Sequence, residues 1–234
     1  MIDSDPNGPY RYPVSDIKDQ DEAPRGIMPS QTVGPYVHIG LTMPGAENLL
    51  DDEADTTGGA AADAVEVTFS VTDGAGHRVK DAMIELWQAD GDGIYPSPYD
   101  ERSDEDSATG WNPQLGAGIG RGFVDDEGEV TFRTRRPGAA PVAVGDSGIE
   151  APHLKVAVFA RGIVERLYTR AYFPAADGAD GADSAALAAD PVLAVVPEDR
   201  RGLLVLTQEG ESSYRMDIVL QHDDATAETP FFRV

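Results

Sequence analysis

The chain contains no cysteine among its 234 residues. This absence excludes disulfide bonds, thiolate catalysis and cysteine-ligated metal centres, and it fits a reducing compartment. A metal ion bound by this chain would therefore need ligands from histidine, tyrosine or carboxylate side chains.

Basic residues are scarce as well, since 18 lysines and arginines stand against 42 aspartates and glutamates, for a formal net charge of -24. Such a charge repels polyphosphate, so we expect no nucleic-acid partner. No apolar run approaches the roughly 20 residues that cross a bilayer, so we expect no membrane span. The first residues have neither a basic start nor an apolar stretch, which argues against a secretory signal, and we expect a cytoplasmic protein.

The chain divides into an arm and one expected domain. Residues 1–28 are polar and contain scattered prolines, which predicts an extended arm rather than a helix. Residues 29–234 are expected to form a single domain. Two stretches rich in alanine, glycine and aspartate, at about 47–64 and 174–190, are interpreted as loop insertions. Helix is scarce, with one short candidate at 191–201.

Between these segments the sequence has the period of β-structure. Residues 65–72 alternate apolar and polar side chains, as a half-buried strand does, and the Asp-Gly-Ala-Gly run that follows is its turn. The further strands that we expect are 82–88, 129–134, 153–159, 166–173, 203–207 and 214–221. About eight short strands with glycine-marked turns predict an all-β protein, a β-sandwich.

The most specific motif lies at 82–95. It reads Ala-Met-Ile-Glu-Leu-Trp-Gln-Ala-Asp and continues to Gly93 and Tyr95. This run resembles the signature of the intradiol ring-cleavage dioxygenases, a family of ferric β-sandwich enzymes, and the resemblance implies a sandwich of the intradiol type. Considered locally, Trp87 is interpreted as a buried aromatic side chain and Glu85 as a paired carboxylate.

Further segments resemble the iron-free, alpha-type chains of this family. They run in order from Pro29 to the carboxyl terminus, and leave only the arm and the loop insertions uncovered. These segments are 29–41, 151–153, 159–162, 166–170, 172–173, 214–218 and 228–232. The resemblance implies a subunit that helps to build an active site whose metal lies in another chain.

The histidines argue against a metal in this chain. The resemblance implies that catalytic chains bind iron(III) through two tyrosinates and two histidines, with the histidines two residues apart on one strand. Residues i and i+2 of a strand face the same side and can converge on one ion. Here the residue two positions after His153 is Lys155 and not a second histidine. A protonated amine has no lone pair, and its charge repels a cation.

The tyrosines agree with the histidines. The resemblance implies that the two tyrosine ligands lie in the segments after Gly138 and before Gly120. These segments contain no tyrosine, and Tyr95 and Tyr99 lie too early in the chain to match. His153 is therefore interpreted as a packed or hydrogen-bonded core residue. We expect no catalytic residue and no metal in this chain, and a vestigial metal site at 153 and 155.

The resemblance places the iron(III) in a beta subunit, with this chain lining that subunit's substrate pocket. The positions it implies are Thr32, Gly34, Pro35, Tyr36 and Arg161. The implied substrates are O2 and 3,4-dihydroxybenzoate, a small aromatic acid whose carboxylate a guanidinium can bind, although Arg161 can equally be a surface hairpin residue. The implied product is 3-carboxy-cis,cis-muconate, with no organic cofactor. An alpha-beta pair repeated into a larger symmetric oligomer is the implied assembly.

Two other interpretations stay open. One is a homomeric intradiol enzyme whose atypical ligands come from His38, His77, His153 and His222. The other is a non-catalytic sandwich that binds a small acid or another protein, since a fold alone does not fix a function.

Overall fold

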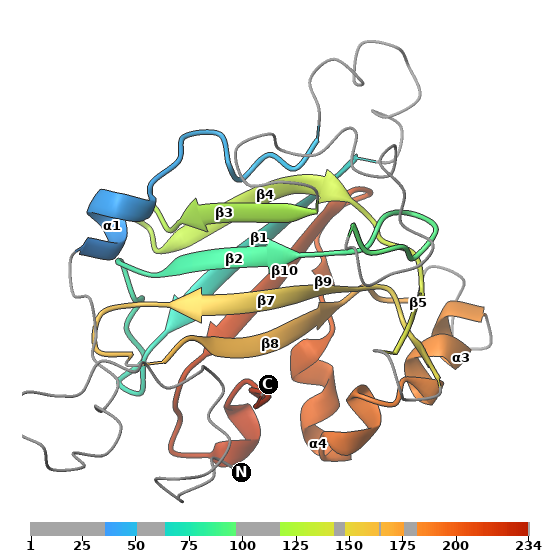
Figure 1. The fold of residues 1–234 in the computed structure, drawn as a ribbon. Helices are drawn as coiled ribbons and strands as arrows, with labels where there is room; N and C mark the ends of the chain where they lie inside the picture. Colours follow the sequence, from blue (N-terminus) through green and yellow to red (C-terminus); the bar gives the residue numbers. More distant parts are fainter. Residues whose placement is uncertain are drawn as a thin grey trace, which may run out of the picture.

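The computed structural model describes residues 36–50, 64–96, 118–142, 148–163, 165–175 and 182–233. The predicted arm lies outside these ranges, as do most of the first predicted insertion and part of the second. Strands predominate in the described residues and form two stacked four-stranded sheets and a small two-stranded one (Figure 1). The predicted β-sandwich is confirmed.

The first sheet has the strand order β4-β1-β10-β9. Its members are β1 (Ala64–Thr72), β4 (Glu129–Arg135), β9 (Thr207–Gln208) and β10 (Ser213–Val219). The pair β1 and β10 is parallel, whereas β1 pairs with β4, and β10 with β9, in antiparallel fashion.

The second sheet carries the candidate site and has the order β3-β2-β7-β8, with all three pairs antiparallel. Its strands are β2 (Met83–Trp87), β3 (Ile119–Phe123), β7 (His153–Phe159) and β8 (Leu167–Tyr172). Because β7 runs antiparallel to β2, the end of β2 and the start of β7 lie at the same end of the sheet.

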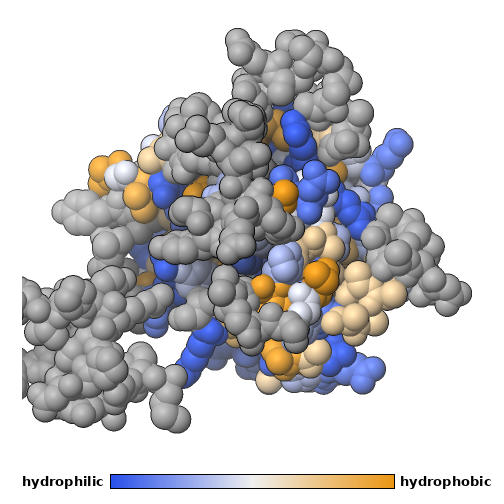
Figure 2. Space-filling model, turned by 45° about the vertical axis from the view of Figure 1, so that its right-hand side comes forward, coloured by the Kyte–Doolittle hydropathy of each residue, from blue (hydrophilic) through white to orange (hydrophobic). Residues whose placement is uncertain are grey.

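Short elements surround the sandwich. They are β5 (Ala140–Pro141), β6 (Ile149–Glu150), α1 (Tyr36–Leu41), α3 (Ala182–Ala189), α4 (Glu198–Arg201) and the 3-10 turns η3 (Leu193–Val195), η4 (Gly202–Leu204) and η5 (Ala225–Ala227). Apolar atoms gather at the lower right of Figure 2, toward the part of the molecule where α3 lies. No helix of the described residues is long and apolar enough to span a bilayer.

The core lies between the two large sheets, where the apolar side chains of each sheet face the other. Buried members include Val67, Phe69, Phe132 and Ile218 from the first sheet and Ile84, Leu86, Leu154, Val156 and Val158 from the second. Burial stabilises the fold by roughly 1.5–3 kcal/mol for each such side chain. The opposite face of the second sheet carries Trp87, Lys155 and Arg170 among its side chains.

Three sequence-based interpretations of local structure were wrong in whole or in part. Residues 202–204 form the turn η4, and β9 begins only at Thr207, so no strand spans 203–207. Leu204 and Leu206 are both buried, and this two-residue spacing imitates a strand. The stretch 174–190 contains α3, because its alanine-rich sequence favours helix. The helix expected at 191–201 is two short pieces separated at Pro197, the N-cap of α4.

The strand β3 was missed because its Ile-Gly-Arg-Gly-Phe sequence is typical of a turn. Its glycines are required by packing between the sheets. A Cβ at Gly122 would lie 2.5 Å from a methyl of Val130, and one at Gly120 would overlap Leu49. Glycine therefore lets the backbone of β3 approach the core side chains closely.

Candidate functional site

Three side chains form a row across the outer face of the second sheet. In the strand register Trp87 is opposite Lys155, and Lys155 is opposite Arg170. Their neighbours Leu86 and Val156 are fully buried in the core, so the row points away from the first sheet. Side chains on one face of adjacent strands contact each other directly.

His153 lies on the same face as Lys155 and is only 2% exposed. Its Nδ1 donates to the carbonyl oxygen of Ala151 at 2.8 Å, which leaves Nε2 to accept from the hydroxyl of Tyr95 at 3.3 Å. Burial, together with the positive charge of Arg170, lowers the pKa of His153 to about 3. The imidazole is therefore neutral, and the contact of Nε2 with Glu150 Oε2 at 3.4 Å is not an ion pair at neutral pH.

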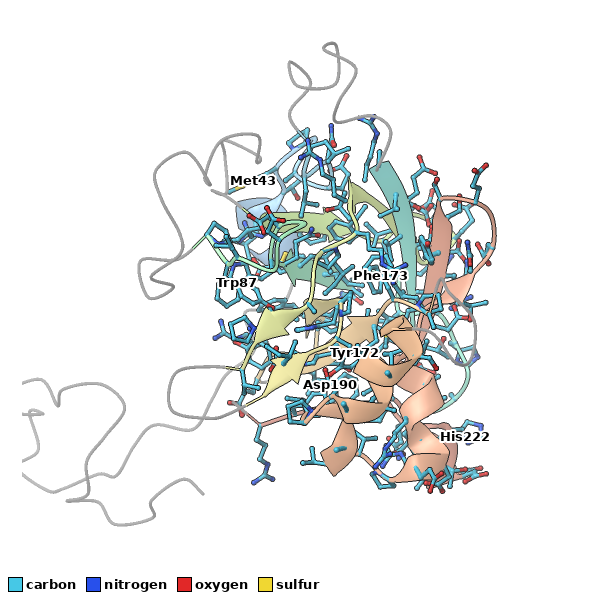
Figure 3. All side chains as sticks on the ribbon, turned by 90° about the vertical axis from the view of Figure 1, so that its right-hand side faces the viewer. Met43, Trp87, Tyr172, Phe173, Asp190 and His222 are labelled. Atoms are coloured by element: carbon cyan, nitrogen blue, oxygen red, sulfur yellow. The ribbon has the colours of Figure 1, made fainter. Side chains whose placement is uncertain are left out.

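A chain of polar groups continues from His153 into the protein. Glu150 accepts from Arg170 at 2.8 Å, and Arg170 also donates to the Tyr172 hydroxyl at 3.4 Å. That hydroxyl donates in turn to Asp190 at 3.1 Å. Figure 3 looks onto this end of the sandwich and shows Tyr172 and Asp190 close together, with Trp87 farther out on the sheet.

Asp190 is a fully buried carboxylate whose acceptor sites are filled by the protein. Oδ2 accepts from the backbone N–H of Ala151 at 2.8 Å, and Oδ1 accepts from those of Val192 at 2.9 Å and Leu193 at 2.7 Å. These bonds tie the segment that follows α3 to the start of β7. Asp190 thereby fixes the carbonyl of Ala151 that orients His153.

Lys155 places its ammonium over two aromatic faces, 4.1 Å from the ring centroid of Tyr95 and 4.8 Å from that of Trp87. Burial lowers the pKa of Lys155, Arg170 lowers it further, and Glu150 opposes both. Protonated Lys155 and Arg170 are a poor environment for a trivalent cation. Within the described ranges, no three histidine, cysteine, aspartate or glutamate side chains gather as a metal-binding group.

The local interpretations of the signature motif had opposite outcomes. Glu85 accepts from Arg121 Nε at 2.7 Å, so the paired carboxylate is confirmed. Trp87 is 37% exposed, so the interpretation of a buried aromatic was wrong. The reason is that Trp87 is the last residue of β2 on the outer face, where the strand leaves the sheet.

The two implied pocket-lining residues that the structure describes, Tyr36 and Arg161, lie at the other end of the sheet. Thr32, Gly34 and Pro35 fall outside the described residues, and Tyr36 opens α1. Arg161 follows β7, and its 65% exposed side chain binds Asp81 through Nε at 2.5 Å. In Figure 1, α1 and the β7 end near Arg161 lie at the left, whereas β7 begins at the right. The length of β7 separates the two ends by roughly 20 Å.

The other histidines do not assemble with His153 in the described structure. His77 lies in the turn after β1 beside Asp73, and His222 follows β10 and contacts Asp224. His38 belongs to α1, and its side chain is not described. No described contact joins any of these residues to the His153 cluster.

Five members of the cluster were not assigned to it from the sequence, namely Tyr95, Glu150, Arg170, Tyr172 and Asp190. Only for Tyr95 did the sequence carry a signal. Asp90 and Gly93 form the same Asp-x-x-Gly turn that was recognised at 73–76, and this turn folds Tyr95 back toward β7. The other four depend on pairing between distant segments, which a single sequence does not display.

Comparison with known proteins places the chain among dioxygenases. Residues 36–222 match the family model described as Dioxygenase. A protocatechuate 3,4-dioxygenase alpha chain of Pseudomonas putida is 35% identical over 213 residues, which are 87% of this chain and 94% of that relative. A protocatechuate 3,4-dioxygenase beta chain of Burkholderia cepacia is 31% identical over 195 residues, 78% of this chain and 77% of that relative.

A solved structure supports the fold. An intradiol ring-cleavage dioxygenase from Tetranychus urticae superposes with a TM-score of 0.51, covering 76% of this chain and 88% of that one at 16% identity. Identity this low shows a shared fold alone. With the family match and the full-length relatives, the conclusion is that the chain belongs to the intradiol dioxygenase family.

Proposed function

We propose that this chain is the iron-free alpha subunit of a protocatechuate 3,4-dioxygenase and that a beta subunit binds the iron(III). The observation that carries the proposal is Lys155, which shares a strand face with His153 where a second metal-binding histidine would stand. An ammonium has no lone pair to donate. The similarity to an alpha chain along 94% of its length supports the assignment.

The proposed pair cleaves 3,4-dihydroxybenzoate with O2 to 3-carboxy-cis,cis-muconate, a step of aromatic catabolism through the β-ketoadipate pathway. The iron(III) of the beta subunit would supply Lewis-acid activation of the catechol. This chain contributes the shape of the pocket and excludes water from it. The pairs are proposed to assemble into a larger symmetric oligomer in the cytoplasm.

Arg161 is the residue of this chain proposed to hold the substrate carboxylate. Its Nε is engaged by Asp81, which fixes the direction of the guanidinium. The terminal N–H groups make no hydrogen bond within the described part of the chain and are available to a carboxylate. A guanidinium can donate two parallel hydrogen bonds to a carboxylate, which favours an acid over an uncharged catechol.

The test is oxygen uptake by the chain alone and by the chain co-expressed with its beta subunit. The proposal predicts uptake with 3,4-dihydroxybenzoate for the pair and none for the isolated chain. Catechol, which lacks the carboxylate, is the control substrate and should turn over less efficiently. Turnover by the isolated chain would favour the homomeric enzyme, and an inactive pair would favour a binding module.

A further inference from the structure

In the part of the chain that the structure describes, the ammonium of Lys155 contacts aromatic rings and no carboxylate. No hydrogen bond or ion pair of Nζ is found within the described residues, and its contacts are the ring faces of Tyr95 and Trp87. Neighbouring arginines differ in this respect, because Arg170 binds Glu150 and Arg121 binds Glu85. Aromatic ring faces do not use up the N–H donors of an ammonium as a carboxylate would. Lys155 can therefore donate hydrogen bonds to a ligand.

The charges around Lys155 favour an arriving anion. Glu150 is the carboxylate that acts on it, and this group is already bound to Arg170. Lys155, Arg170 and Glu150, the charges that act on one another directly here, sum to about +1. The next carboxylate, Asp190, is joined to them only through the Tyr172 hydroxyl. Burial lowers the pKa of Lys155, Glu150 opposes this shift in part, and Arg170 adds to it, so the nearby carboxylate does not fully compensate the buried ammonium.

The rings beside Lys155 supply a surface for an apolar, flat group. Trp87 is 37% exposed and its ring lies 4.9 Å from that of Tyr95, tilted by 50°. In the register Ile119 is opposite Trp87 on the same outer face, which extends the apolar edge. A ring stacked on Trp87 would place a carboxylate on that ring within reach of the neighbouring ammonium.

We propose that Trp87, Tyr95 and Lys155 form a binding site for a small aromatic carboxylate, with the acid group on Lys155 and the ring against Trp87. The site uses side chains of this chain alone and does not rest on the proposed function. Arg170 binds Glu150 and so keeps this carboxylate engaged beside the site. Binding is non-covalent.

The test uses the full chain and 4-hydroxybenzoate as probe. Lys18, Lys80 and Lys155 are the only lysines, so acetylation by an amine-reactive ester can be followed at each position by mass spectrometry. The expected result is that the probe slows acetylation of Lys155 severalfold in a saturable manner, while exposed Lys80 is unaffected. Quenching of tryptophan fluorescence gives an independent dissociation constant.

Two further ligands test the contact with the ammonium and the contact with the aromatic rings separately in the wild-type protein. Benzamide keeps the ring without the charge, and acetate keeps the charge without the ring. Both should protect Lys155 at least tenfold less well than the probe at equal concentration, since each loses one of the two contacts. Equal protection by benzamide would overturn the role of the ammonium, and equal protection by acetate would overturn the aromatic site.

Variants give the second line of evidence. Lys155→Met should weaken binding of 4-hydroxybenzoate by about tenfold or more, whereas Lys155→Arg, which keeps the charge, should bind within a few-fold of wild type. An unchanged dissociation constant in a folded Lys155→Met variant would overturn the proposal. If that variant does not fold, the comparison of the three ligands on the wild-type chain decides alone.

Discussion

At the scale of single residues, the polar groups buried behind the outer face of the second sheet hold one another in place. His153 is oriented by the carbonyl of Ala151, and the N–H of Ala151 is bound by Asp190. A buried polar group costs free energy unless it has a hydrogen-bond partner. Removing one member therefore leaves the buried groups that it bound without a partner. The cluster is therefore a sensitive point of the fold.

Asp190→Ala should lower the free energy of unfolding by about 3–5 kcal/mol, because three backbone N–H groups and the Tyr172 hydroxyl lose an acceptor. Urea denaturation measures the change. Asp223→Ala removes a carboxylate at an exposed position and should change stability by less than about 0.5 kcal/mol. Equal effects of the two substitutions would contradict the anchoring role of Asp190.

His153 should make stability depend on pH. Its pKa is lowered from 6.5 to about 3 in the folded protein, so protons bind the unfolded state more readily. The contribution is complete above pH 6.5 and is lost as the pH falls toward 3, with a slope of at most about 1.4 kcal/mol per pH unit.

Urea denaturation between about pH 6 and pH 4 should therefore show a steeper loss of stability for wild type than for His153→Gln. The exposed His222→Gln is the matched control and should keep the wild-type slope. The same slope in His153→Gln as in wild type would mean that the imidazole is not buried in its neutral form.

At the scale of elements, one turn recurs three times, at 73–76, 90–93 and 125–128. In each, the aspartate side chain accepts from the backbone N–H groups two and four residues later, and a glycine with positive φ stands at the fourth position. The pattern Asp-x-x-Gly predicts these turns because both residues have a physical role.

The turns provide a matched pair of glycines. Gly76 (φ 79°) and Gly93 (φ 74°) have the same conformation, but a Cβ at Gly76 meets nothing within 4 Å, whereas one at Gly93 overlaps the carbonyl of Ala139. Gly76→Ala should cost roughly 1–2 kcal/mol for the left-handed backbone. Gly93→Ala should cost clearly more in urea denaturation and displace Tyr95. Equal costs would contradict the packing around Gly93.

The strands that could be predicted from the sequence are those whose alternation directly reflects the core, such as β1, β4 and β10. Missed elements have other causes. The strand β3 depends on glycines that fit between distant side chains, so tertiary packing decides its structure and local sequence does not report it. The helix α1 has only six residues, which is too short for a helical period to show in its sequence.

At the scale of the molecule, the two proposed sites lie at opposite ends of the second sheet. The end of β2 and the start of β7 carry Trp87, His153 and Lys155 at one end. The helix α1 and the end of β7, which Arg161 follows, lie at the other (Figure 1). The sequence alone predicted His153, Lys155 and Arg161 as positions of interest through their motifs. It did not predict the network of Glu150, Arg170, Tyr172 and Asp190, since strand pairing and the fold behind the sheet bring these side chains together.

In the complex with the beta subunit, Arg161→Ala should raise the Michaelis constant for 3,4-dihydroxybenzoate severalfold while leaving stability unchanged, because the side chain is exposed and its proposed contact is the substrate carboxylate. Steady-state oxygen uptake measures it. Arg166→Ala removes the same charge from the same connection between β7 and β8 and should have a smaller effect. Unchanged kinetics for Arg161→Ala would leave it a surface residue.

The most direct test of the central claim is the iron content of this chain purified alone and as a complex with the beta subunit. The isolated chain should contain no iron and show no tyrosinate-to-iron absorption, because Lys155 stands where a second histidine would be needed. The complex should contain stoichiometric iron. Stoichiometric iron in the isolated chain would contradict the assignment of an iron-free subunit.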